Sequence, residues 1–381
     1  MSFKILEKDQ NSQARTGKIT TPHGVIETPA FVVVGTRAKV KCLEPQDLQK
    51  VGTQLIIANT FHLWRDLGDK LDSFPGLAEY TGWGIPTMTD SGGYQVFSFG
   101  FRREDPTGKI SGSAPLQRGP RENMTRITDE GVFFRDGDTE GFLNPRISIG
   151  IQEKLGADII FAFDECTSPN HPHEYIKKSL ERTEKWAVES LTAHTRKDQL
   201  LYGIVQGSLN QELRTKAAKF LGSLDFGGYG VGGSLPEEAE KMHEELGWIT
   251  ANLPEEKPRH LLGVGKIRDI LLAVDQGMDT FDCVIPTREA RHGRIWTLGG
   301  HFDILKQRFA DDTSILVPNC QCPACQAGTT KSQLRALFKE KNPEAGHLAS
   351  IHNVFFLNDA FRQIREAIHE GRFQLLKEEW L

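Results

Sequence analysis

Eight short apolar segments recur along this chain, and helical stretches separate most of them. Most segments end in glycine or in a polar residue, while the stretches between them, most clearly 174–195 and 211–221, carry apolar residues three and four positions apart. This alternation predicts an α/β fold whose parallel strands close into a (β/α)8 barrel, a TIM barrel. A doubly wound open sheet is the competing arrangement. The eight expected strands are 30–34, 54–58, 86–89, 158–162, 200–205, 228–231, 260–264 and 280–285.

A chain of 381 residues can form one barrel domain, 1–381. Two segments of it are additions to the strands and helices of a minimal barrel. Residues 100–144 are polar and rich in Gly, Pro and Arg, which predicts an insertion after the third strand. We expect its first half to be mobile and 127–134 to pair with 141–143 as a hairpin. Residues 318–381 contain clustered cysteines followed by amphipathic helices that we expect to pack on the barrel. The apolar face of these helices comprises Val354, Phe355, Leu357, Phe361, Ile364 and Ile368.

Charge and hydropathy limit the location and partners of the protein. No stretch of 18 apolar residues predicts a membrane span, and the polar N-terminus lacks a signal core, so we expect a cytoplasmic protein. The formal net charge of −5 argues against indiscriminate nucleic-acid binding, but a local basic surface remains compatible with it. Such a surface is predicted in 288–308, where basic residues outnumber acidic ones.

An aspartate, Asp282, lies within the last expected strand. Its apolar neighbours in 281–285 predict a short buried strand, and an acid there is costly to bury without a partner or a task. The loop beyond this strand offers three guanidinium groups to a polyanion. These belong to Arg288, Arg291 and Arg294. A structural aspartate that caps the strand end is the alternative interpretation.

Polar residues and glycines also follow the other expected strands. In a parallel barrel the reactive groups gather where the strands end, so we expect these residues at one mouth. They are Asp90-Ser91-Gly92-Gly93-Tyr94-Gln95, Asp164-Glu165-Cys166, Gln206-Gly207, Gly232-Gly233 and Gly263-Val264-Gly265-Lys266.

This set suits chemistry at a nucleoside. Two carboxylates, Asp90 and Asp282, are candidates for retaining displacement at an anomeric carbon. A carboxylate such as Asp164 can accept paired N–H bonds from a guanine-like edge, and the amide of Gln206 can donate and accept. Glycines permit the close approach of a carbonyl oxygen to backbone N–H groups. Aromatic and apolar side chains that can stack on a base are Tyr94 and Leu262.

Three of the six cysteines lie together, at Cys320, Cys322 and Cys325. In a cytosolic chain such clustering favours a metal over disulfides. A fourth ligand is available from His347 or His352. A Cys3His set predicts one structural, tetrahedral Zn²⁺ per chain.

Together these segments closely resemble the tRNA-guanine transglycosylases, also called queuine tRNA-ribosyltransferases, of the bacterial type. The resemblance covers nearly the whole chain. It rests on the motifs Thr89-Asp90-Ser91-Gly92-Gly93-Tyr94-Gln95, Ala162-Phe163-Asp164-Glu165-Cys166, Gly203-Ile204-Val205-Gln206-Gly207, Val231-Gly232-Gly233, Leu262-Gly263-Val264-Gly265-Lys266 and Phe281-Asp282-Cys283-Val284-Ile285-Pro286-Thr287-Arg288.

The resemblance implies exchange of guanine at wobble position 34 of tRNAs with GUN anticodons, those for Asp, Asn, His and Tyr. It makes Asp282 the nucleophile that forms a covalent ribosyl-enzyme and Asp90 the proton acceptor for the incoming 7-deazaguanine. It also implies a homodimer formed beside the zinc segment, and it favours His352, which Asn353 follows, over His347. The implied base pocket comprises Asp90, Ser91, Gly92, Gly93, Tyr94, Asp164, Gln206, Gly232, Gly233 and Leu262. The implied RNA contacts are Gly263, Val264, Gly265, Lys266, Thr287, Arg288 and Arg291.

The chain departs from the family pattern in two places, and one of them bears on the expected base. Bacterial members usually read Gly-Gly-Leu-Ala-Val-Gly after the sixth strand, whereas this chain has the shorter 233–237 loop, Gly-Ser-Leu-Pro-Glu. Cys166 fits members that take the small base preQ1, while the altered loop leaves queuine open as the alternative. The 100–144 insertion is also longer than usual.

Rival functions are a non-catalytic tRNA-binding subunit and a relative that acts on DNA or on the D-arm of tRNA.

Overall fold

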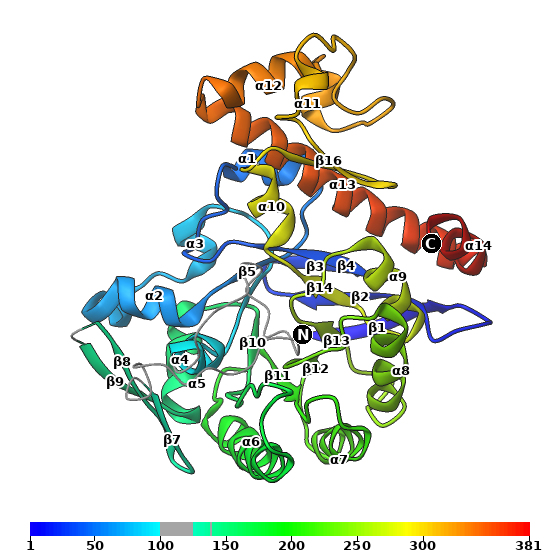
Figure 1. Cartoon of the computed structure of the whole chain (residues 1–381). Helices are drawn as coiled ribbons and strands as arrows, with labels where there is room; N and C mark the ends of the chain where they lie inside the picture. Colours follow the sequence, from blue (N-terminus) through cyan, green and yellow to red (C-terminus); the bar gives the residue numbers. More distant parts are fainter. Residues whose placement is uncertain (100–124, 138) are drawn as a thin grey trace.

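The structure, a computed structural model, describes residues 1–99, 125–137 and 139–381, and its centre is a closed barrel of parallel strands (Figure 1). Strands adjacent in chain order pair with one another, and the last strand pairs with the first. The predicted barrel is therefore confirmed, and the open sheet is excluded. The strands are β4 (Ala30–Val34), β5 (Ile56–Ala58), β6 (Thr87–Thr89), β10 (Ile159–Phe161), β11 (Leu200–Val205), β12 (Gly228–Val231), β13 (Arg259–Leu261) and β14 (Thr280–Asp282).

The last two barrel strands are shorter than the sequence predicts. The strands expected to continue to positions 264 and 285 end at Leu261 and Asp282. Gly263 has a φ of +75°, which interrupts strand geometry, and helix α10 (Ile285–Ala290) starts with a proline in its first turn. Asp282 is consequently the last residue of its strand, directly at the mouth of the barrel.

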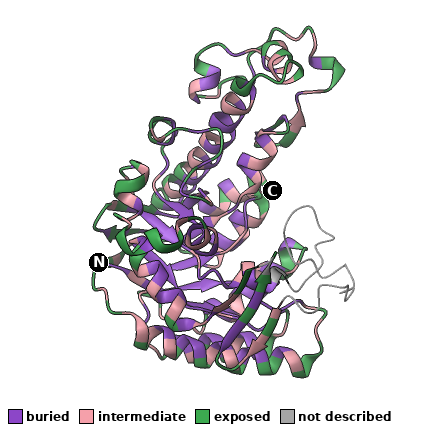
Figure 2. Cartoon of the chain, turned by 90° about the vertical axis from the view of Figure 1, so that its left-hand side faces the viewer, coloured by how far each residue is buried: buried purple, intermediate pink, exposed green. Residues whose placement is uncertain are grey.

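Helices surround the barrel, and their exposed faces point outward while the strands are buried (Figure 2). The helices predicted at 174–195 and 211–221 are confirmed as α6 and α7. Asparagine side chains at positions 59, 144 and 210 cap α2, α5 and α7 by accepting a backbone N–H. The helices are α1 (Pro45–Lys50), α2 (Thr60–Leu67), α3 (Leu77–Thr81), α4 (Gly93–Phe99), α5 (Pro145–Leu155), α6 (His173–Ala193), α7 (Gln211–Gly222), α8 (Ala239–Thr250) and α9 (Ile267–Asp275).

An N-terminal antiparallel sheet, which the sequence analysis did not anticipate, covers the end of the barrel opposite the strand carboxyl ends. It comprises β1 (Ser2–Lys8), β2 (Arg15–Thr21) and β3 (Gly24–Thr28). Ile19 and Ile26 belong to the same buried cluster as the apolar side chains inside the barrel. His23, in the turn between β2 and β3, contacts Asp158 just before β10, with Nδ1 and Oδ1 2.9 Å apart.

A buried ion pair joins this sheet to the last barrel strand. Arg15 donates two N–H bonds to the carboxylate of Asp279, 2.9 and 2.7 Å long, and both side chains are almost fully buried. Asp279 also accepts the backbone N–H of Arg259 at 2.7 Å. Loss of one partner of such a pair typically costs about 3–5 kcal/mol, because a buried charge is left uncompensated. This network holds the start of β14 in place.

The described part of the insertion is a three-stranded antiparallel sheet, which contains the predicted pairing of 132–134 with 141–143 and adds one more strand. It comprises β7 (Thr125–Thr128), β8 (Gly131–Asp136) and β9 (Thr139–Leu143). The segment expected as one strand, 127–134, turns back at residues 129 and 130, where the backbone carbonyl of Asp129 accepts the indole N–H of Trp186 at 3.0 Å. The mobility expected for the first half of the insertion concerns residues that lie largely outside the described part of the chain.

The C-terminal segment forms a lobe at one end of a long helix, α13 (Pro343–His369) (Figure 1). The predicted apolar face of α13 is buried except at Phe355, which is partly buried. Phe361 packs on β14 and β4 through the rings of Phe281 and Phe31. No helix among the described residues is long and apolar enough to span a membrane. The other elements are the 3-10 helices η1 (Gly68–Ser73) and η2 (Gln307–Phe309), the hairpin β15 (Arg294–Thr297) and β16 (Gly300–Asp303), and α11 (Pro323–Gln326), α12 (Lys331–Lys339) and α14 (Phe373–Trp380).

Candidate active site

The polar strand ends meet at the carboxyl-terminal mouth of the barrel. Because all eight barrel strands run parallel, the residues that follow them lie at one end. Asp90 follows β6, Asp164 lies beyond β10, Gln206 follows β11, and Asp282 ends β14. Asp90 interacts electrostatically with Asp282, and Asp164 accepts a hydrogen bond from Gln206.

The carboxylate of Asp90 is held by three N–H donors from two loops. Asn59 donates to Oδ2 at 2.5 Å, while the backbone N–H groups of Thr60 and Gly92 donate to Oδ1 at 3.0 and 3.1 Å. Burial raises the pKa of Asp90 to about 7, because its effect and the nearby charge of Asp282 outweigh the three donors. The group is therefore poised to exchange a proton near neutral pH.

Asp164 and Gln206 form a second polar pair. The amide of Gln206 donates to Oδ2 of Asp164 at 2.7 Å, and the Ser91 hydroxyl donates to Oδ1 at 3.3 Å. Burial raises the pKa of Asp164 to about 6, so this carboxylate is mainly ionised at neutral pH. An ionised carboxylate accepts hydrogen bonds only, as recognition of adjacent N–H groups on a base requires.

The glycines after β12 lie against Gln206. Gly233 has a φ of +81°, and a Cβ there would lie 2.2 Å from Oε1 of Gln206. Oε1 itself is buried and has no hydrogen-bond partner among the described residues. An unpartnered buried carbonyl costs about 1–3 kcal/mol, which indicates a site that a ligand completes.

A buried arginine that the sequence analysis missed organises this side of the mouth. Arg214, on α7, is fully buried and donates to the backbone carbonyls of four loop residues. Its carboxylate partner is Glu245 on α8, with Nη2 and Oε1 2.9 Å apart. The four carbonyls belong to Val205, Ser208, Gly232 and Ser234, at 2.8 to 2.9 Å. Only the guanidinium group presents five N–H donors in one plane, so Arg214 fixes the ends of β11 and β12 relative to each other.

Two other residues that follow β10, Glu165 and Cys166, have buried surroundings that do not suit a reactive group. Glu165, counted from the sequence among the acids that converge on the mouth, is buried against Arg182 and accepts the Tyr175 hydroxyl at 2.6 Å. Its carboxylate therefore neutralises the charge of Arg182 on α6 and does not belong to the cluster of candidate reactive groups. Burial raises the pKa of the Cys166 thiol to about 12, so Cys166 is a neutral lining residue.

The side chain of Asp282 is 15% exposed and is bound through one oxygen. Its Oδ1 accepts the backbone N–H of Gly263 at 3.1 Å and lies 3.2 Å from Nε2 of His260. His260, fully buried on β13, is a second residue that the sequence analysis missed. Neither His260 nor Arg214 belongs to a motif that carries the family resemblance, and their contacts depend on strand register and on helix packing.

The remaining expected contact residues differ in their exposure. Tyr94 and Leu262 are partly buried, Lys266 is exposed, and Arg288 is partly exposed on α10. Arg291 follows α10 and donates to the carbonyl of Thr287 at 2.9 Å, while burial lowers its pKa. Arg294 is the first residue of β15 and pairs with Glu289 of α10 at 2.7 Å.

The three clustered cysteines converge with His352 on α13. All four ligand atoms lie within 4.8 Å of one another, and Nδ1 of His352 is 3.4 to 3.7 Å from the three sulfurs. A tetrahedral zinc with ordinary bond lengths would separate nitrogen from sulfur by roughly 3.6 Å. The donor set therefore fits Zn²⁺. His347 instead faces Asp47, with Nε2 and Oδ2 3.7 Å apart.

Contacts around this metal centre link it to the helix that follows Asp282. Nε2 of His352 donates to the carbonyl of Trp296 at 2.9 Å, which leaves Nδ1 unprotonated for a metal. Asn353, the next residue, donates to the carbonyls of Pro286 and Arg294 at 3.0 Å. The metal centre thereby supports α10 and its arginine.

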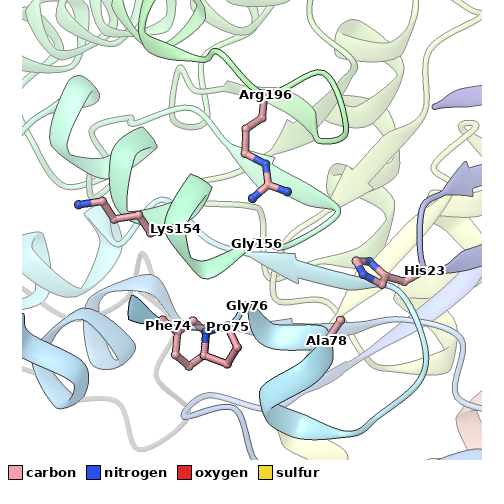
Figure 3. Close-up of a pocket in the computed structure, with 8 residues that line it drawn as sticks. All are labelled: His23, Phe74, Pro75, Gly76, Ala78, Lys154, Gly156 and Arg196. Atoms are coloured by element: carbon pink, nitrogen blue, oxygen red, sulfur yellow. The ribbon is translucent and has the colours of Figure 1, made fainter. Parts of the chain in front are cut away.

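A separate cavity of about 190 Å³ is lined by His23, Phe74, Pro75, Gly76, Ala78, Lys154, Gly156 and Arg196 (Figure 3). Residues that line it precede β6, β10 and β11 and therefore belong to the amino-terminal end. Its basic side chains are already paired, Lys154 with Asp72 at 2.5 Å and Arg196 with Asp198 at 2.6 Å. The cavity therefore lies at the end of the barrel opposite the strand carboxyl ends, and it is not part of the candidate active site.

Comparison with known proteins accounts for this arrangement. A family model described as queuine tRNA-ribosyltransferase matches residues 9–381. The chain belongs to this family. Two queuine tRNA-ribosyltransferases, from Halothermothrix orenii and Francisella tularensis subsp. mediasiatica, are each 40% identical to it, over 386 and 385 residues. Each alignment covers 100% of this chain, with 97% and 98% of the respective relative. The resemblance to queuine tRNA-ribosyltransferases seen in the sequence is confirmed.

The metal centre predicts a specific result for Cys322→Ala. This variant removes a buried ligand from the Cys3His set, so we expect it to lose the full equivalent of zinc and to become poorly soluble. Zinc per chain is measured by elemental analysis. Cys42→Ala is the matched control, because Cys42 is an exposed cysteine outside the cluster and its variant should keep the metal. A full equivalent of zinc in Cys322→Ala would refute the assignment.

Proposed function

We propose that this chain exchanges guanine at wobble position 34 of GUN-anticodon tRNAs for the 7-deazaguanine preQ1. Its family makes it a tRNA-guanine transglycosylase, a pentosyltransferase that acts on tRNA. The observation that carries the finer proposal is the contrast between two neighbouring carboxylates. Asp90 has a pKa raised to about 7, and Asp282 is held by one oxygen at the barrel mouth.

In the first displacement, a carboxylate oxygen of Asp282 attacks C1′ of the target nucleotide. The C1′–N9 bond breaks with its electron pair on N9, and guanine leaves after taking up a proton. Microscopic reversal of the second step makes the protonated form of Asp90 the donor of that proton. The product is a covalent ribosyl-aspartate, which conserves the energy of the glycosidic bond and needs no nucleotide triphosphate.

In the second displacement, the incoming base binds where guanine was. Its N9–H proton passes to ionised Asp90, N9 attacks C1′, and the bond from C1′ to Asp282 breaks. Two inversions at C1′ leave the configuration unchanged, as in retaining glycosidases. The transfer balances without an oxidant, a reductant or water.

The base pocket that we propose uses the polar pair beside Asp90. Ionised Asp164 accepts the N–H groups of the base edge, and backbone N–H groups at Gly232 and Gly233 bind its carbonyl oxygen. Gln206 now donates to Asp164, so it must rotate its amide toward the base when a base binds. Its buried, unpartnered Oε1 supports this exchange of partners. Tyr94 and Leu262 enclose the base from either side.

The proposed RNA contacts lie after β13 and on and after helix α10. They are Gly263, Val264, Gly265, Lys266, Thr287, Arg288 and Arg291. Guanidinium groups on and after α10 suit phosphates and the edges of bases next to the target guanine. The wobble base must leave its stack to reach the mouth, at a cost of a few kcal/mol that stacking and base-edge bonds offset.

The loop after β12 supports the small base preQ1. Ser234 is buried, and its hydroxyl donates to the carbonyl of Thr167 at 2.9 Å. Its own carbonyl is bound by Arg214 at 2.8 Å. A loop pinned at both groups resists the displacement that a larger substituent at C7 of the base requires. Queuine, the base in the names of the relatives, is therefore the second candidate.

Several finer expectations remain part of the proposal. Presence of both Asp90 and Asp282 argues against a non-catalytic tRNA-binding subunit. Zinc at the Cys3His centre would have a structural role, because four protein ligands leave no open position. A homodimer beside the zinc segment and a cytoplasmic location stay predictions.

A parallel exchange assay tests the identity of the base. With an anticodon stem-loop as acceptor, we expect kcat/KM for preQ1 to exceed that for queuine by about tenfold or more, because the pinned loop excludes the larger substituent. Ser234→Ala, which frees the loop from Thr167, should narrow this preference. Equal or faster use of queuine by the unaltered protein would overturn the choice of base. Exchange only into duplex DNA would overturn the choice of nucleic acid.

The raised pKa of Asp90 predicts the pH dependence of the second displacement. The rate at which labelled guanine attacks a preformed ribosyl-enzyme should rise with pH, because the base form of Asp90 accepts the proton. The ester removes the charge of Asp282, which lowers the pKa of Asp90, so the midpoint should lie at or somewhat below about 7. Ionisation of Asp164, whose pKa is about 6, contributes the earlier part of the rise.

Asn59→Ser provides the matched variant for this pH profile. Serine still caps α2 but does not reach Asp90, so the carboxylate loses one stabilising N–H donor and its pKa rises further. We expect the midpoint to move to higher pH. A rate that falls with rising pH, or a midpoint unchanged by Asn59→Ser, would contradict the role of Asp90.

A further inference from the structure

We propose that His260 is a positioning residue that holds Oδ1 of Asp282 and thereby assigns Oδ2 as the atom that attacks C1′. This inference rests on the proposed function, because it takes Asp282 as the nucleophile. It concerns a side chain outside every motif by which the chain resembles its family. Its basis is the geometry of two neighbouring barrel strands.

Strand register brings His260 to Asp282. His260 on β13 lies opposite Thr280 on β14, and Nδ1 of the imidazole is 2.9 Å from Oγ1 of Thr280. Asp282 is two residues beyond Thr280, so its side chain points to the same face of the strand. The other imidazole nitrogen, Nε2, lies 3.2 Å from Oδ1 of Asp282. One ring thus bridges two side chains of the neighbouring strand.

The two oxygens of Asp282 have different surroundings. Oδ1 faces Nε2 of His260 and also accepts the backbone N–H of Gly263 at 3.1 Å. For Oδ2, no hydrogen-bond partner is found in the described part of the chain. A carboxylate held by two donors at one oxygen cannot rotate freely, so its other oxygen keeps one direction. Such preorganisation lowers the entropic part of a displacement barrier.

The surroundings of the ring fix which nitrogen donates. A carboxylate accepts only, so Nε2 must carry a hydrogen, and in the neutral ring Nδ1 then accepts the single hydroxyl hydrogen of Thr280. His260 is fully buried, and the Phe161 ring packs on it with the centroids 5.4 Å apart. Ring packing and the hydroxyl of Thr280 therefore hold the donor toward Asp282 without requiring a charged imidazole.

The same contact serves both displacements. When Oδ2 bonds to C1′ and the C1′–N9 bond breaks, Oδ1 becomes the carbonyl oxygen of the ester and keeps its two donors. When the new base attacks, the Oδ2–C1′ bond breaks and its electron pair returns to the carboxylate. Nε2–H and the N–H of Gly263 then stabilise the negative charge that reappears, as preorganised donors do in an oxyanion site.

The test compares three variants in a single-turnover assay of ribosyl-enzyme formation with an anticodon stem-loop. His260→Phe keeps a ring against Phe161 but loses the donor, so adduct formation should slow by about 10- to 100-fold. His260→Gln places an amide N–H near the position of Nε2 and should recover most of that rate. Thr280→Val removes the partner of Nδ1 and should produce an intermediate loss. Affinity for the stem-loop should change less than about twofold in all three, because the contact acts on the reacting carboxylate.

The outcomes separate this inference from the function on which it rests. No adduct with the unaltered protein, under conditions where the stem-loop binds, would refute the nucleophile itself. An adduct that forms equally fast in the unaltered protein and in His260→Phe would refute only the role of His260. Equal losses in His260→Phe and His260→Gln would also refute it, since shape and not the donor would then matter. Equal thermal midpoints of the two His260 variants verify that both are folded.

Discussion

The last strand of the barrel pairs with the first, with Thr280, Phe281 and Asp282 in register with Ala30, Phe31 and Val32. This pairing leaves no open edge in the barrel and places all strand carboxyl ends around one mouth. Residues nearly 200 positions apart, such as Asp90 and Asp282, can then influence each other's charge. At the opposite end of the barrel, the ion pair of Arg15 and Asp279 holds the start of the same strand, β14. Reactive groups and supporting contacts thus occupy opposite ends of one structure.

Burial acts on the carboxylates of this mouth to different extents. Desolvation raises the pKa of Asp90 more than its three N–H donors lower it, so this pKa is about 7. The pKa of Asp164 is about 6. Asp282 stays partly exposed and keeps donors on one oxygen. In the proposed mechanism these different surroundings give the three carboxylates separate roles, as nucleophile, proton carrier and base-edge acceptor. The proposed double displacement at C1′ requires all three roles.

Much of this arrangement could be predicted from the sequence, because periodicity and strand-end residues are local signals. Six of the eight barrel strands were placed within about two residues of their observed ends, and the cysteine cluster indicated a metal centre. The early ends of β13 and β14 were missed, since apolar residues such as Val264 and Ile285 continue the strand pattern through a turn and a helix. Glu165 was grouped with the polar residues of the mouth, because the sequence does not show that Arg182 on the following helix, α6, pairs with it. His260 and Arg214 were missed for a related reason: their roles depend on strand register and helix packing, which no local pattern records.

In the proposed mechanism, Asp282 carries the ribosyl group between the two displacements. The most direct measurement is to trap the adduct with an anticodon stem-loop, isolate it under denaturing conditions, digest it with protease and nuclease, and locate the ribosyl remnant by mass spectrometry. We expect a remnant on Asp282, and no adduct from Asp282→Asn although this variant still binds the stem-loop. A remnant on Asp90 or on another residue, or an adduct from Asp282→Asn, would contradict the proposed mechanism.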